Sequence, residues 1–194
     1  MITGPLQQVK ATVAAAAAGL ALVAFLATLA IAAGPAASVA EAACPKASQP
    51  ATELSREALR KATMCRINDL RRSKGRTPVV RRMPLQRVAQ RHTKVMVRTG
   101  CLRHRCGGEA PLKRRLRRSG YLDGAKRWRF GQNTGCAMTA RVMVRKWRQS
   151  RFHRKNMLRA GFEHIGVGAI PRVSHPSCPE GAATFTALLT WRDP

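Results

Sequence analysis

Six cysteines are the residues whose type and number most constrain the chemistry of this sequence. No two of them form a Cys-x-x-Cys pair, which removes the main support for a zinc ribbon or a dithiol redox centre. In an oxidising compartment six thiols are expected to pair into three disulfides. Six cysteines permit 15 pairings, and sequence alone does not choose among them. The six are Cys44, Cys65, Cys101, Cys106, Cys136 and Cys178.

The other residue types that support covalent or acid–base catalysis show no recognisable arrangement. Ser55, Ser73, Ser119 and Ser150 lack the surroundings of a nucleophile elbow or a Ser-x-x-Lys motif. Oxidised thiols are not nucleophiles. The few Asp and Glu residues are scattered and do not form the paired carboxylates of a glycosidase. These residue types therefore favour a binding protein over an enzyme.

The first 42 residues have the composition of an export signal. No charged residue occurs between Ala11 and Ala40, and the strongly apolar stretch within this run follows a single Lys10. Small residues at positions 40 and 42 predict a signal peptide over 1–42, cleaved after Ala42 or alternatively after Ala40. The same run is long enough for an uncleaved membrane anchor. We expect the rest of the chain to be secreted or to lie outside the cell.

The chain is strongly basic, with 36 Lys and Arg against 9 Asp and Glu and a net charge of +27. This excess excludes an ordinary neutral or acidic enzyme surface and predicts attraction to polyanions. The candidate partners of an exported chain are an anionic wall polymer, an acidic lipid surface or extracellular nucleic acid; a merely solvated basic surface is the alternative. No helix-turn-helix or zinc-finger spacing predicts sequence-specific nucleic-acid binding. The basic clusters fall at 71–76, 81–82, 113–118 and 141–154.

Helical periodicity is found in the first part of the exported chain. We expect an N-terminal arm over 43–57, in which residues 44–54 are extended and lead to Ser55, a candidate helix cap. Apolar residues then recur at three- and four-residue steps in two long segments and again after Thr139. The expected helices run from Ser55 to Gly75, from Pro84 to Gly100, from Pro111 to Ser119, and from Thr139 through Trp147.

The last third of the chain changes from helical periodicity to alternation. Ile165, Val167 and Ala169 alternate with glycines, and apolar residues from Phe185 to Trp191 alternate with threonines and Leu188. These two segments are predicted strands. Early helices and late strands predict an α+β domain in which helices pack on an antiparallel sheet.

Short strings along the chain resemble, in order, those of the CAP superfamily, in particular its bacterial secreted branch. This superfamily shares the SCP domain and includes cysteine-rich secretory proteins, antigen 5 and plant pathogenesis-related proteins. Each string alone is weak, but seven in register are specific. They are Ile67-Asn68-Asp69-Leu70-Arg71; Ala89-Gln90-Arg91-His92-Thr93 with Met96; Gly100-Cys101-Leu102-Arg103-His104; Leu116-Arg117-Arg118-Ser119-Gly120-Tyr121; Gly131-Gln132-Asn133; Trp147, Ser150, His153-Arg154 and Asn156-Met157-Leu158; and Ile165-Gly166-Val167-Gly168 with Thr184-Phe185-Thr186.

The resemblance implies an SCP domain over 58–194, built as an α-β-α sandwich with a central antiparallel sheet and a cleft at the end of the sheet. It also implies a disulfide pattern in which Cys44 pairs with Cys65, Cys136 with Cys178, and Cys101 with Cys106. By loop-closure arithmetic each of the two longer bridges contributes roughly 3 to 4 kcal/mol.

The resemblance further implies that His104, Gln132 and His153 line the cleft. His104 matches the first cleft histidine of the family, and His153 matches the histidine of the bacterial Ser-x-x-His-Arg block. Imidazoles are suitable ligands for zinc or copper, so His104 and His153 are the candidate metal ligands. Gln132 stands where many members have Glu, and an amide is neither a general base nor a good zinc ligand. We therefore expect no required cofactor.

The same residues have simpler structural interpretations. His104 lies between two cysteines, so in the alternative interpretation it is a surface residue of a disulfide-closed loop and has no binding role. His153 in the alternative interpretation caps a turn. Gln132 is expected to bond backbone groups of a loop. His92 falls on the apolar stripe of its helix and is predicted to be a buried, hydrogen-bonded packing residue. Trp128, between two arginines, is predicted to be exposed.

Three functions follow from these observations. The first is a secreted protein that binds an unknown extracellular ligand and has no clear catalytic site. The second is a basic protein that binds an anionic polymer or lipid surface. The third is a metal-dependent hydrolase that uses His104 and His153.

Overall fold

The computed structural model of the 194-residue chain describes residues 44–193. The predicted signal peptide over 1–42 and its cleavage site lie outside the described residues. None of the helices within 44–193 is both long and apolar enough to cross a membrane.

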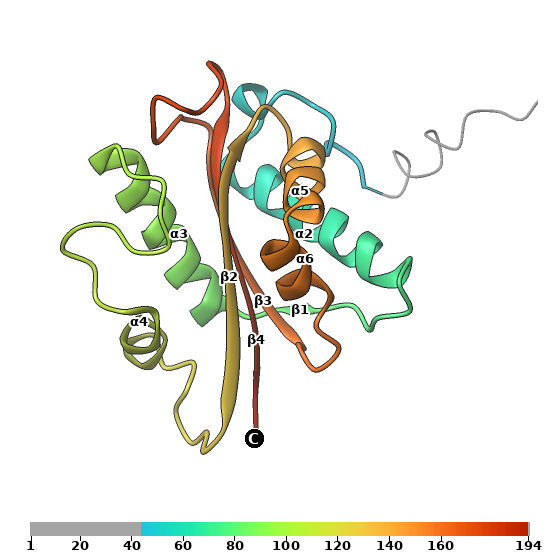
Figure 1. The fold of residues 1–194 in the computed structure, drawn as a ribbon, viewed down its shortest axis with the longest axis vertical. Coiled ribbons are helices and arrows are strands. Elements are labelled where there is room, and N and C mark those ends of the chain that lie inside the picture. Colours follow the sequence, from blue (N-terminus) through green and yellow to red (C-terminus); the bar gives the residue numbers. More distant parts are fainter. Residues whose placement is uncertain (1–43, 194) are drawn as a thin grey trace, which may run out of the picture. The chain divides into compact units, whose positions relative to one another are not determined.

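The described residues form three layers, with a four-stranded sheet between two groups of helices (Figure 1). Helices α3 and α4 cover one face of the sheet, and α2, α5 and α6 cover the other. The strand order is β1-β3-β4-β2. The strands are β1 (Val80–Arg81), β2 (Trp128–Ala137), β3 (His164–Ile170) and β4 (Ala183–Arg192). The helices are α2 (Arg56–Arg72), α3 (Met83–Thr99), α4 (Leu112–Arg118), α5 (Ala140–Gln149) and α6 (Arg151–Leu158).

The predicted α+β sandwich is confirmed, with one difference in the sheet. Strands β2, β4 and β3 are antiparallel, but the short edge strand β1 pairs with β3 in parallel. The strands predicted from alternation correspond to β3 and β4. Strand β2 was not predicted as a strand, although it pairs with β4 along its full length, from Trp128 opposite Arg192 to Ala137 opposite Ala183.

The predicted helices form where apolar periodicity and capping agree. The Ser55 hydroxyl accepts a hydrogen bond from the Ala58 N–H, and the Thr139 hydroxyl accepts one from the Val142 N–H, so both act as N-caps. Gly100 ends α3 in the left-handed conformation with φ of 65°. Helix α6 was not predicted as a separate helix.

Two glycines of β3 bring α3 into direct contact with the sheet. A Cβ atom added at Gly166 would lie 2.2 Å from the backbone carbon of Leu85, and one at Gly168 would lie 2.4 Å from the Ala89 carbonyl oxygen. The alternation of glycine with apolar residues in β3 is therefore a packing requirement. One face of the strand receives the α3 backbone, and the other contributes side chains to the core.

Three disulfides join the pairs that the resemblance implied, namely Cys44 with Cys65, Cys101 with Cys106, and Cys136 with Cys178. The first of these bridges changes the expected shape of the N-terminal segment. Instead of an extended arm, residues 44–54 turn back and include a short 3-10 helix, η1 (Ala51–Glu53). The Ala51 N–H donates to the Met138 carbonyl and the Arg141 N–H donates to the Ala47 carbonyl, so this segment packs beside the start of α5.

Arg71, near the end of α2, is a fully buried arginine that bonds to backbone oxygens. Its guanidinium donates to the carbonyls of Thr77 at 2.7 Å, Met157 at 2.7 Å, Arg159 at 3.1 Å and Phe162 at 2.9 Å. Burial lowers the pKa of Arg71, but a guanidinium begins so high that it stays protonated. This side chain therefore ties α2 to the end of α6 and to the turn before β3.

Replacing Arg71 with methionine is expected to lower the free energy of unfolding by about 3 to 5 kcal/mol, because four carbonyl groups lose their donor. Urea unfolding followed by circular dichroism measures the change. Arg72→Met is the matched control, since this neighbouring arginine is exposed and its substitution is expected to cost less than about 0.5 kcal/mol. Equal effects of the two substitutions would contradict the role assigned to Arg71.

Candidate functional site

The candidate site is organised by two adjacent side chains of the edge strand β2. Gln132 donates from Nε2 to the carbonyl oxygen of His104 at 3.2 Å, and Asn133 donates from Nδ2 to the carbonyl oxygen of His153 at 3.0 Å. Neighbouring residues of a strand point to opposite faces of the sheet. The two amides therefore hold two segments that lie in different layers, the loop after α3 and helix α6. The expectation that Gln132 bonds loop backbone agrees with this contact.

The structure brings His104 and His153 together. Their ring centroids are 6.2 Å apart, and the rings meet edge to face at 61°. His104 has the more exposed surface of the two, although protein atoms surround part of it, and His153 is half-buried. The pair sits beside the middle of edge strand β2, whereas the resemblance implied a cleft at the end of the sheet.

Both imidazoles are held in the neutral form near neutral pH. Partial burial lowers the pKa of His104, and the Arg115 guanidinium lowers it further. Burial also lowers the pKa of His153, with the neighbouring His104 as the second cause. A neutral imidazole has one N–H donor and one acceptor nitrogen. The pair therefore presents both kinds of hydrogen-bonding group to a ligand.

Asn156 supports this arrangement and was quoted from the sequence only as part of a motif. Its Nδ2 donates to the side-chain oxygen of Asn133 at 2.9 Å, which fixes the amide that holds His153. A Cβ atom at Gly131 would lie 2.5 Å from Asn156 Oδ1, so glycine is needed where α6 meets β2. Sequence reasoning missed the positioning roles of Asn133 and Asn156; the adjacent pair Gln132-Asn133 was the signal available.

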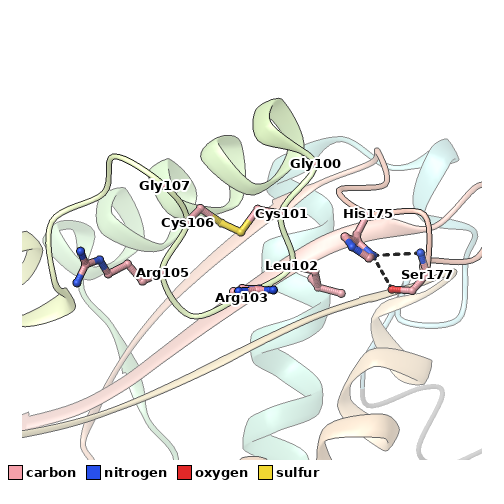
Figure 2. Close-up of a pocket in the computed structure, with 9 residues that line it drawn as sticks. All are labelled: Gly100, Cys101, Leu102, Arg103, Arg105, Cys106, Gly107, His175 and Ser177. Carbon is pink, nitrogen blue, oxygen red and sulfur yellow. Dashed lines mark hydrogen bonds between the residues drawn. A yellow bond between two sulfur atoms is a disulfide. The ribbon is translucent and has the colours of Figure 1, made fainter.

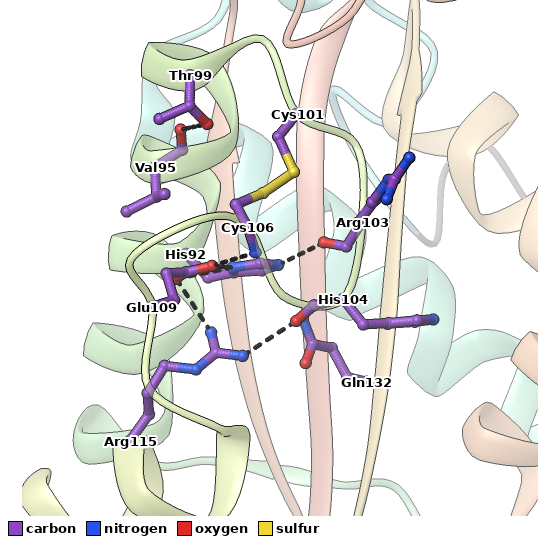
Figure 3. Close-up of a disulfide and its surroundings, with 10 residues drawn as sticks. All are labelled: His92, Val95, Thr99, Cys101, Arg103, His104, Cys106, Glu109, Arg115 and Gln132. Carbon is purple, nitrogen blue, oxygen red and sulfur yellow. Dashed lines mark hydrogen bonds and ion pairs between the residues drawn. A yellow bond between two sulfur atoms is a disulfide. The ribbon is translucent and has the colours of Figure 1, made fainter.

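A buried polar cluster anchors the loop that carries His104 (Figure 3). Glu109 accepts from the Cys106 N–H at 3.0 Å and lies 2.8 Å from His92 Nδ1. Arg115 bridges the Glu109 carboxylate, at 3.4 Å, and the His104 carbonyl, at 3.1 Å. Together with the Cys101–Cys106 disulfide, these contacts fix the backbone on both sides of His104.

His92 is buried and hydrogen-bonded, as predicted. Its Nδ1 faces the Glu109 carboxylate, and its Nε2 lies 3.0 Å from the Arg103 carbonyl oxygen, so both ring nitrogens face oxygens. A neutral imidazole has only one N–H. Burial is the largest influence on the pKa of His92 and lowers it, while the Glu109 carboxylate acts in the opposite direction. The sequence indicated the burial of His92 but not its partner.

Other residues singled out in the sequence lie outside the histidine pair. His175 Nδ1 lies 2.9 Å from the Ser177 hydroxyl, at one side of a hollow of about 530 Å³ that the Cys101–Cys106 loop also borders (Figure 2). His164 Nδ1 lies 2.9 Å from the Tyr121 hydroxyl. Trp128 is half-buried and not exposed as expected, because Lys113 and Arg117 stack over its ring.

The residues present do not complete a zinc site. Structural and catalytic zinc sites use three or four protein donors, and His104 with His153 supply two. Gln132, where a carboxylate would be the third donor, is committed to the His104 carbonyl. Among residues 44–193, no group of three or more His, Cys, Asp or Glu side chains is placed to hold a metal ion.

Comparisons with known proteins agree with this fold. The sequence profile of the CAP, cysteine-rich secretory protein family matches residues 64–178. An extracellular protein from Bacillus anthracis that contains an SCP domain is 21% identical, with a TM-score of 0.56 over 69% of this chain and 40% of that protein. An outer surface protein of Borrelia burgdorferi is 17% identical, with a TM-score of 0.54 over 69% of this chain and 92% of that protein. No curated protein sequence matches the chain.

The electrostatic contact between the two histidines gives a measurable prediction. His104→Ala is expected to raise the pKa of His153 toward its ordinary value, because the substitution admits water and removes a ring that becomes positively charged in the acidic range where His153 itself takes up a proton. A pH titration of the imidazole NMR signals measures the shift. His175→Ala serves as the control and is expected to leave the pKa of His153 unchanged. A His153 pKa that is the same in the wild type and in His104→Ala would show that the rings do not interact.

Proposed function

We propose that this chain, which belongs to the cysteine-rich secretory protein family, is an exported protein that binds a ligand outside the cell without converting it. Its three disulfides suit an oxidising compartment. The Bacillus protein of similar fold is extracellular and the Borrelia protein is an outer surface protein, which supports the same location for this chain.

The observation that carries the proposal is the pair of imidazoles whose ring centroids lie 6.2 Å apart, on two segments that Gln132 and Asn133 hold by their backbone carbonyls. Because Gln132 and Asn133 bond to the carbonyls of the histidines and not to their rings, both rings remain available to a ligand. The backbone that carries each ring is held in place before a ligand arrives, which reduces the ordering cost of binding.

The same geometry argues against metal-dependent hydrolysis as the function. A neutral imidazole is itself a general base, but among residues 44–193 the pair has no third side chain that would complete a metal site to activate water. The amide of Gln132 is not a base, and the nearby Glu109 carboxylate is committed to His92, Arg115 and the Cys106 N–H. What the pair does offer is one donor and one acceptor on each ring, which suits recognition of a polar ligand.

Native mass spectrometry of protein recovered from culture medium tests this function. Wild-type protein is expected to carry an additional non-covalent mass, and the double variant His104→Ala/His153→Ala is expected to lose it by at least about tenfold in occupancy. His175→Ala, which removes an exposed histidine outside the pair, should retain the mass. Equal masses on the wild type and the double variant, including no bound mass on either, would rule out the histidine pair as the binding site.

We also propose that the domain needs no metal. Dialysis against EDTA is expected to change the Tm by less than about 1 °C, because only a species that binds the folded state adds to its stability. Differential scanning calorimetry before and after dialysis measures the Tm. A fall of several degrees that zinc restores in the wild type, but not in His104→Ala, would revive a metal-dependent role for the pair.

A further inference from the structure

The outer side of helices α5 and α6 carries charge of one sign. Residues 140–159 contain eight Lys and Arg and no Asp or Glu. Most of these cations are exposed, since the inner sides of both helices pack against the sheet and α2. We call six of the exposed residues the α5–α6 face, namely Arg145, Arg148, Arg151, Phe152, Arg154 and Lys155. Lys146 is exposed too but is not counted, because its Nζ donates to the Cys136 carbonyl oxygen of β2.

The cations of this face are not neutralised by neighbouring carboxylates. None of its five Lys and Arg side chains forms an ion pair with a carboxylate of residues 44–193. On α2, by contrast, Glu57 pairs with Arg60, Lys61 and Arg81. The α5–α6 face therefore keeps its full positive charge for an external partner.

Phe152 distinguishes this face from an ordinary basic surface. Its side chain is the most exposed of the large hydrophobic residues within 44–193, at 78%. It lies in the first turn of α6, directly after Arg151 and one turn before Lys155. An exposed aromatic residue that follows and precedes cationic residues in the sequence of a helix is a composition found in interfacial helices, which enter the boundary between lipid headgroups and acyl chains.

A groove of about 270 Å³ between α2 and α5 opens beside the same face. Arg145 and Arg148 line it together with the apolar side chains of Leu70 and Val144. Asp69, the carboxylate in this lining, already pairs with Arg66 at 2.9 Å. The groove therefore has the size and charge to receive a phosphate headgroup beside the α5–α6 face.

We propose that the α5–α6 face docks on an anionic lipid surface, with the cations at the headgroups and Phe152 inserted between them. The positive charge alone fits any polyanion. The exposed ring favours a lipid surface, because a polymer dissolved in water gives an apolar side chain no apolar phase to enter. This docking is independent of the ligand proposed for the histidine pair, which lies on the inner side of α6.

The proposal makes separate predictions for charge and for apolar insertion. Each cation near an anionic surface is worth about fivefold in partitioning, so Arg148→Gln/Arg151→Gln is expected to weaken binding by at least about tenfold. Phe152→Ser is expected to weaken binding by about tenfold through loss of apolar burial. Raising the salt concentration is expected to weaken the electrostatic contribution to vesicle binding and to leave the contribution of Phe152 unchanged.

Co-sedimentation with vesicles of phosphatidylcholine, with and without phosphatidylglycerol, measures the partitioning of the full chain. The matched charge control is Arg87→Gln/Arg91→Gln, which removes two exposed arginines from α3 in the opposite helix layer. A parallel titration with inorganic polyphosphate measures binding to a soluble polyanion. The double variant His104→Ala/His153→Ala is expected to bind vesicles like the wild type, which separates this proposal from the proposed ligand site. Unchanged melting curves show that the variants are folded.

Binding to phosphatidylglycerol vesicles that falls in the α5–α6 variants, but not in the α3 control, supports the proposal. Three outcomes overturn it. One is no binding to anionic vesicles, and the second is an equal loss in the α3 control, which indicates attraction by net charge alone. The third is vesicle binding that is insensitive to Phe152→Ser while polyphosphate binding depends on the same arginines, which identifies a polymer site.

Discussion

The pleat of strand β2 is the constraint on which the candidate site depends, because successive side chains of a strand face opposite sides of its sheet. Gln132 and Asn133 are consecutive, so their amides hold the backbones of His104 and His153 in different helix layers. A slip of one residue against β4 would exchange the faces and separate the two rings. Pairing along the whole of β2, and the close contact of Gly131 with Asn156, fix the register.

Scarcity of carboxylates shapes how the rest of the domain is held. With 36 basic and 9 acidic residues in the chain, most arginines have no carboxylate available, and like charges repel one another. Several arginines bond instead to carbonyl oxygens: Arg71 to four of them, Arg115 to His104, and Arg154 to Arg148. The bonds of Arg71 to Met157, Arg159 and Phe162 join elements distant in sequence without requiring negative charge. The disulfides supply further links that do not depend on charge.

The sequence predicted best those helices and strands whose burial produces a regular pattern of apolar residues. Helices α2, α3 and α5 bury one stripe, so their periodicity was visible, and β3 and β4 alternate in composition. Strand β2 was missed because its polar Gln132 and Asn133 are buried by contacts to loop and helix backbone, which no local pattern reveals. Motif order placed His104 and His153 in one cleft, but Glu109 as the partner of His92 required the folded loop.

Helix α6 links the histidine pair to the α5–α6 face. Its inner side presents His153 to His104 and Asn156 to β2, and Met157 is buried, whereas its outer side exposes Arg151 and Phe152. Arg71 holds the carbonyls of Met157 and Arg159 at the end of this helix. A substitution on the inner side that disturbs these contacts moves the whole helix, and with it the side chains on its outer side. Within residues 44–193 the side chains of Arg151 and Phe152 form no hydrogen bond or ion pair, and Phe152 is 78% exposed, so substitutions there are expected to leave the inner side in place. A loss of binding in variants of Arg151 or Phe152 therefore reports on the α5–α6 face itself. A loss of binding in variants of His153 or Asn156 is interpreted only after the fold of the variant has been checked.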